Sequence, residues 1–94
     1  MYGMCGKLIA QPGQRDQLAG ILARAARVVG GLPGCRLYLV CEDLGDENAV
    51  WVFESWEDKA SHDASLQDEQ VRPLMGGPPE GSELRVVGGY GLDG

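Results

Sequence analysis

The segment AVWVFESW, residues 49–56, places one carboxylate in an otherwise apolar strand pattern, and the only histidine of the chain follows six residues after it. Glu54 in such a strand needs a partner, because an unpaired buried carboxylate is unfavourable. His62 can exchange protons near neutral pH. We therefore take Glu54 and His62 as candidate groups for general acid–base catalysis. The alternatives are a surface histidine and a structural pairing of Glu54 with a backbone amide or with Arg36, Arg85 or Tyr38.

Aromatic residues surround these two groups. Trp51 and Trp56 are five positions apart, so in a regular strand they point to opposite faces, Trp56 with Glu54 and Trp51 with Phe53. Large aromatic rings stack on flat aromatic ligands, whereas packing in a core or a subunit interface is the alternative. The candidate substrate-binding residues are Trp51, Trp56, Tyr38 and Phe53.

Cysteine chemistry is not expected. Cys5, Cys35 and Cys41 do not have the spacing of a metal site, and Cys35 and Cys41 are roughly 20 Å apart along an extended strand, too far to form a disulfide. We expect all three to be small buried apolar residues. A redox or nucleophilic role would require His62 to reach one of them.

Length and charge limit the classes of function. The 94 residues allow one domain, residues 1–94, and a net charge of −6 repels nucleic acid and anionic lipid. The chain has no apolar run long enough for a membrane span, no secretory signal, and no motif for a nucleotide cofactor or metal. We therefore expect a cytoplasmic protein without cofactor, nucleic-acid partner or membrane.

Apolar patterns and turn residues predict six elements in the order β-α-β-β-α-β. The second helix is expected from Lys59 to about Gln67, with Asp58 as its N-cap. A short turn at Val71–Met75 and a loop at Gly76–Gly81 follow. The strands are expected at Tyr2–Ala10, Cys35–Glu42, Ala49–Trp56 and Ser82–Gly88.

The first helix has an apolar face that contains Leu18, Leu22, Ala25 and Val29, with Ile21 and Val28 beside it. Gly30 and Gly31 are expected to end this helix through the left-handed conformation that glycine adopts easily. The residues expected on its outer surface are Arg15, Asp16, Arg24 and Arg27.

Two successive β-α-β halves predict a ferredoxin-like α+β fold, with a four-stranded antiparallel sheet and both helices on one face. Residues 37–40 and 50–53 are apolar on both faces of their strands. Two helices cover only one face, and an open apolar face of this size is unusual in a monomer. We therefore expect a homodimer with sheet packed on sheet; the alternative is a monomer with the aromatic residues at sheet edges.

The run GLPGCRLYLV, an acidic loop, and then AVWVFESWEDKASHDASL resemble the antibiotic biosynthesis monooxygenase superfamily of dimeric α+β barrels. The most specific element is the third strand ending in Glu54, Ser55 and Trp56. The resemblance implies oxygenation without a cofactor, in which dioxygen converts a small phenolic or quinol-type aromatic substrate to a quinone. A non-catalytic dimer that binds a small ligand is the alternative.

Two positions distinguish branches of that superfamily. The heme-degrading branch has an Asn where Gly6 stands and a Trp where Ser65 stands, so the resemblance disfavours heme degradation. The quinol-oxidising branch commonly has a histidine at the position of Ser65. His62, three residues earlier, is not its equivalent.

Overall fold

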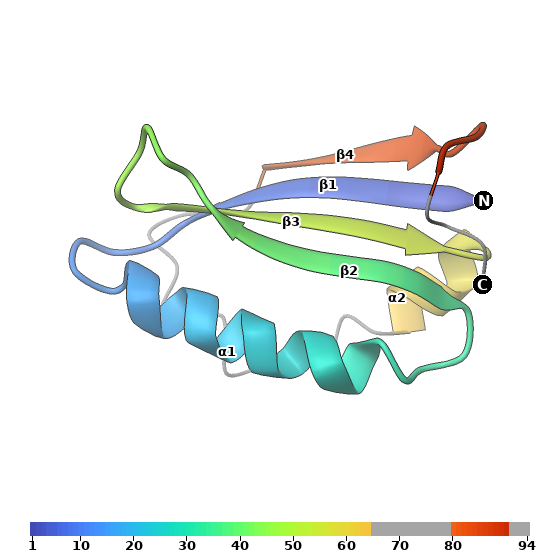
Figure 1. Cartoon of the computed structure of the whole chain (residues 1–94), viewed down its shortest axis with the longest axis horizontal. Helices are drawn as coiled ribbons and strands as arrows, with labels where there is room; N and C mark the ends of the chain where they lie inside the picture. Colours follow the sequence, from blue (N-terminus) through green and yellow to red (C-terminus); the bar gives the residue numbers. More distant parts are fainter. Residues whose placement is uncertain (65–79, 91–94) are drawn as a thin grey trace.

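A computed structural model describes residues 1–64 and 80–90 of the chain (Figure 1). Four strands form one antiparallel sheet in the order β2-β3-β1-β4, and both helices lie on the same side of it. This arrangement confirms the predicted ferredoxin-like α+β fold. The elements are β1 (Tyr2–Ile9), α1 (Arg15–Val29), β2 (Cys35–Glu42), β3 (Ala49–Trp56), α2 (Lys59–Ala64) and β4 (Glu80–Arg85).

The core lies between α1 and the two central strands. Leu18 and Leu22, one helical turn apart, pack against Val50 and Val52, which alternate along β3 toward the helices. All four side chains are buried, and burial of apolar side chains is the main driving force for docking the helix on the sheet. Partly buried residues extend this cluster: Leu8, Ala19, Tyr38 and Val40.

The expected bounds hold for β2 and β3, and β1 ends at Ile9, one residue before the expected end. Strand β4 both begins and ends earlier than the sequence pattern predicts, since residues 86–88 lie outside it. Its range is fixed by pairing with β1, from Lys7 opposite Glu80 to Tyr2 opposite Arg85. Glu80 and Gly81 therefore belong to a strand and not to the expected loop. The other expectations for 65–79, including the end of the second helix and the turn at 71–75, lie outside the described residues.

The end of α1 differs from the prediction. Gly30 has φ −61°, a right-handed conformation, and its N–H donates to the carbonyl oxygen of Ala26. The glycine with positive φ between α1 and β2 is Gly34, with φ +88°, just before β2. The helix thus ends through ordinary backbone hydrogen bonds, and the reversal that needs glycine comes four residues later.

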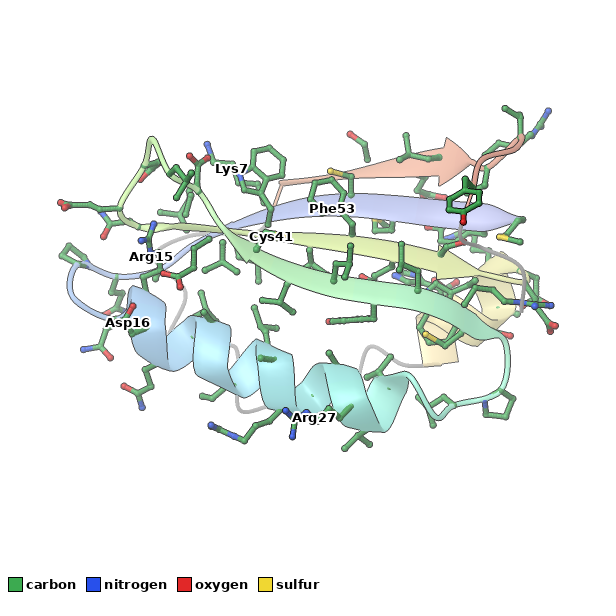
Figure 2. All side chains as sticks on the ribbon, in the orientation of Figure 1. Lys7, Arg15, Asp16, Arg27, Cys41 and Phe53 are labelled. Atoms are coloured by element: carbon green, nitrogen blue, oxygen red, sulfur yellow. The ribbon has the colours of Figure 1, made fainter. Side chains whose placement is uncertain are left out.

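Two residues of α1 lie in environments that differ from the predicted ones. Val28, expected beside the apolar face, is 71% exposed. Arg15, expected on the outer surface, donates to the carbonyl oxygens of Asp43 and Asp46 at 2.9 and 2.8 Å and pairs with Glu42 at 3.0 Å. Arg15 thereby holds the β2–β3 hairpin against the start of α1, and Figure 2 shows it beside that hairpin. Within the described residues, no helix has the length and apolar character needed to cross a bilayer.

Candidate functional site

Strand β3 presents two different sets of side chains to the two faces of the sheet. Residues directly opposite one another on antiparallel strands share a face. Glu54 pairs with Met4 and Tyr38, and Trp56 pairs with Tyr2, so these residues lie on the helix side. The predicted separation of Trp56 from Trp51 is confirmed by this register.

Helix α2 brings His62 to the same side. Its start is fixed by Asp58, whose carboxylate accepts from the N–H of Ser61 at 2.8 Å, as predicted for an N-cap. This hydrogen bond lowers the pKa of Asp58. One residue after Ser61, the His62 ring is buried, with 3% exposure, and lies 5.2 Å from the Tyr2 ring and 6.1 Å from the Trp56 ring.

Glu54 and His62, the two predicted catalytic groups, are neighbours. Oε1 of Glu54 accepts from Nε1 of Trp56 at 3.0 Å and lies 3.8 Å from Nε2 of His62. The side chains of Glu54 and His62 are 9% and 3% exposed. The indole N–H thus compensates the buried carboxylate, whereas the imidazole lies beside it beyond hydrogen-bond distance. Arg36, one expected partner, pairs with Glu57 at 2.9 Å.

Two residues of this site were missed by sequence reasoning. Asp63 faces the other side of the histidine, with Oδ1 3.1 Å from Nδ1 of His62. Tyr2 is the second; burial, and next the nearby Glu83 carboxylate, raise its pKa. The adjacency of Asp63 to the only histidine and the register of Tyr2 opposite Trp56 were the available signals, but the second requires the sheet to be known.

A charged rim surrounds Tyr2. Nζ of Lys59 lies 5.8 Å from the Tyr2 ring centroid, 3.4 Å from Asp63 and 3.7 Å from Glu83. The carboxylates of Asp63 and Glu83 raise the pKa of Lys59. Beside this rim lies a surface depression of about 430 Å³, lined by Met1, Tyr2, Glu57, Asp58, Glu83, Leu84 and Arg85. Tyr2 therefore contacts both the depression and His62.

Trp51 and Phe53, two of the predicted substrate-binding residues, lie on the opposite face of the sheet. Their rings stack at 6.3 Å, and Nε1 of Trp51 donates to Asp43 at 2.8 Å. Figure 2 shows Phe53 on the side of the sheet away from α1. The structure therefore does not bring these two rings together with His62, whereas it places Trp56 and Tyr38 on the same face as Glu54.

The side of the sheet opposite the helices is mainly apolar. Leu39, Phe53 and Leu84 are 49%, 39% and 50% exposed on it. Trp51 lies opposite Lys7 on the neighbouring strand, and Nζ of Lys7 is 5.6 Å from the centroid of the indole ring. Gly3 allows the close approach of β4, because a Cβ at this residue would lie 3.3 Å from Cβ of Leu84 in that strand. We call this surface, on the side of the sheet opposite the helices, the open face. Its apolar residues and Cys41 are joined on the same side by Cys5, Lys7 and Ser82; the former are Leu37, Leu39, Cys41, Trp51, Phe53 and Leu84.

The three cysteines are free. Cys5 and Cys35 are partly buried, and burial raises the pKa of the Cys35 thiol. Cys41 is exposed on the open face, so the expectation that it is buried is wrong for the single chain. Within residues 1–64 and 80–90, no group of three His, Cys, Asp or Glu side chains is placed to hold a metal ion.

Comparison with known proteins places these residues in a family context. The family model described as antibiotic biosynthesis monooxygenase matches residues 1–75. The chain belongs to this family. A search of curated proteins found no match.

Solved structures extend this family relationship over the whole chain. A protein from Chloroflexus aurantiacus J-10-fl, only provisionally called an antibiotic biosynthesis monooxygenase, is 41% identical over 97% of each chain, with a TM-score of 0.83. A similarly named Deinococcus radiodurans protein is 22% identical over 100% of each chain, with a TM-score of 0.80. Rv0793 from Mycobacterium tuberculosis is 18% identical over 96% of this chain and 98% of its own, with a TM-score of 0.80. The last two show similarity of fold alone.

Proposed function

We propose that this family member is a cofactor-independent monooxygenase that oxidises a small phenolic or quinol-type aromatic compound to a quinone. One oxygen atom of dioxygen enters the ring, the substrate loses one ring hydrogen and one hydroxyl hydrogen, and the second oxygen leaves as water. A phenol thus gives a quinone, and a quinol gives a hydroxylated quinone with the same balance. The observation that supports this reaction is the buried pair of Glu54 and His62, 3.8 Å apart.

The proposed reaction requires two things of the protein, which are proton transfer and the enclosure of the substrate. A phenolate or quinolate is electron-rich enough to reduce dioxygen, so the protein must remove the hydroxyl proton and exclude water. In our proposal, Nε2 of His62 accepts that proton and the Glu54 carboxylate stabilises the imidazolium that forms. Tyr2 and Trp56, which flank the imidazole, shield this pair from solvent.

We further propose that the chain works as a homodimer joined through the open face. Dimer formation would remove the exposed apolar residues of this face from water. The free-energy gain is about 25 cal/mol per Å² of apolar area buried, before the cost of association is subtracted. This arrangement assigns Trp51 and Phe53 to assembly and leaves Glu54, Trp56, Tyr38 and His62 for substrate. Three free cysteines fit a reducing compartment, so we propose a cytoplasmic location.

The test is oxygen consumption by the purified, metal-stripped protein with a panel of phenols and reduced naphthoquinols. We expect faster oxidation than in buffer and incorporation of one ¹⁸O atom from ¹⁸O₂ into the quinone. His62→Ala and Glu54→Gln should lower the rate by about 10²–10⁴-fold, the usual effect of losing a general base. Gln17→Ala, on the exposed side of α1, is the matched control and should leave it unchanged. Saturable binding of these compounds without acceleration would instead support a non-catalytic ligand-binding dimer.

A further inference from the structure

His62 has a carboxylate on each side of its ring. Nδ1 lies 3.1 Å from Oδ1 of Asp63, within hydrogen-bond distance, and Nε2 lies 3.8 Å from Oε1 of Glu54, beyond it. The two carboxylates differ in exposure, with side chains of Asp63 and Glu54 50% and 9% exposed. The histidine therefore lies between a surface carboxylate and a buried one.

Asp63 is an acceptor for the Nδ1 proton. The hydrogen bond from His62 is the main cause that lowers the pKa of Asp63, followed in the same direction by the charge of Lys59. An ionised carboxylate has no proton to donate, so the hydrogen bond requires the hydrogen on Nδ1. Lys59 lies 3.4 Å from the other oxygen, Oδ2, so each oxygen of Asp63 has its own partner.

The position of this hydrogen determines what the opposite nitrogen can do. In neutral imidazole one nitrogen is a donor and the other an acceptor. With the hydrogen on Nδ1, Nε2 carries the lone pair on the side of Glu54. Two acceptors then face each other across 3.8 Å, and a proton taken up at Nε2 relieves that repulsion.

We propose that Asp63 is a positioning residue that holds His62 with its hydrogen on Nδ1, so that Nε2 is the atom that accepts a proton. The role in catalysis rests on the proposed function, whereas the tautomer exists without substrate. Tyr2, Trp56 and Glu83 surround the same ring and rim and remain unchanged in the test below. Asp63 itself does not touch the reacting atoms; it acts through the imidazole.

The chain has a single histidine, so its ring nitrogens can be observed without assignment. We would label the protein with ¹⁵N-histidine and record long-range ¹H–¹⁵N spectra at rising pH until the ring is neutral, in the absence of substrate. The wild type should show a protonated Nδ1 and an unprotonated Nε2. In Asp63→Ala, the hydrogen should move toward Nε2, where Glu54 can accept it. Asp16→Ala, which removes an exposed carboxylate from α1, is the matched control and should keep the wild-type spectrum.

A wild-type protein with its hydrogen on Nε2, or an Asp63→Ala spectrum identical to the wild type, overturns the proposal whatever the enzymatic result. If the tautomer shifts as expected, turnover in Asp63→Ala should fall by less than the about 10²–10⁴-fold that accompanies loss of the base itself. An unchanged turnover would remove Asp63 from catalysis. Absence of oxidation in the wild type would refute the proposed function and leave the assigned tautomer standing.

Discussion

Gly34→Ala tests how the turn before β2 positions the helix that carries His62. Gly34 has φ +88°, and a Cβ at this residue would lie 2.7 Å from Oγ and 2.9 Å from Cβ of Ser61. The Gly34 carbonyl oxygen also accepts from the N–H of Glu57 at 2.8 Å, just before α2. The glycine thus lets the chain pass close to the residue that precedes His62.

Two separate effects should lower the free energy of unfolding in Gly34→Ala. A left-handed conformation costs an alanine about 1–2 kcal/mol, and forcing a methyl group into a filled space costs about 1–3 kcal/mol. Gly13 has a similar φ of +81°, but a Cβ at this residue would have no atom within 4 Å. Gly13→Ala should therefore show only the cost of the left-handed conformation. The difference in the free energy of unfolding between the two variants then measures the cost of the contact with Ser61.

Urea unfolding at one fixed protein concentration measures both variants, because the stability of the proposed dimer would depend on concentration. We expect Gly34→Ala to be less stable than Gly13→Ala by about 1–3 kcal/mol, and Ser61→Gly to remove most of that difference when combined with Gly34→Ala. Equal destabilisation of the two single variants would refute the close approach of this turn to α2.

Three further perturbations address assembly, the hairpin and the buried carboxylate. If the chain forms the proposed dimer through the open face, Phe53→Asp should give monomers in sedimentation at micromolar concentration, whereas Val28→Asp, on the exposed surface of α1, should not. A wild-type monomer would refute the dimer, and a persistent Phe53→Asp dimer would place the interface elsewhere. The hydrogen bond from Trp51 lowers the pKa of Asp43. This hydrogen bond therefore stabilises the folded protein at pH values above the pKa of an unfolded aspartate, about 3.9. The stabilisation is lost as the pH falls through the lower pKa of the folded state. Urea unfolding between pH 7 and 3 should show a smaller acid loss in Asp43→Asn than in Glu47→Gln, and equal losses would contradict this assignment. Trp56→Phe removes the N–H that donates a hydrogen bond to Glu54. It should lower the free energy of unfolding by about 1–3 kcal/mol and slow turnover. If stability and turnover are both unchanged, the indole N–H is not needed.

The fold was predictable because its signals are local. Four apolar strand patterns and two helical ones fix the element order, and the five-residue separation of Trp51 and Trp56 fixes their opposite faces. The start of α2 was also predictable, because Asp58 caps it through a hydrogen bond to a residue only three positions away.

The errors come from long-range contacts. Arg15 is drawn inward by carbonyl oxygens about thirty residues away, and the start of β4 is set by its pairing with β1. The site shows the same limit: Glu54 and His62 could be chosen by residue type, but the contact of Tyr2 with His62 depends on β1 lying beside β3. Neither the sequence of β1 nor that of β3 alone predicts that the two strands pair.

The alternation of β3 divides its eight residues between the two faces of the sheet. Even-numbered positions 50, 52, 54 and 56 face the helices, and odd-numbered positions 51 and 53 face outward. If the proposed ligand site and dimer exist, substitutions at the even positions alter ligand preference and leave the subunit contact untouched, and those at the odd positions do the reverse. A one-residue insertion would exchange the two sets at once, so length changes within this strand should be far rarer in evolution than replacements.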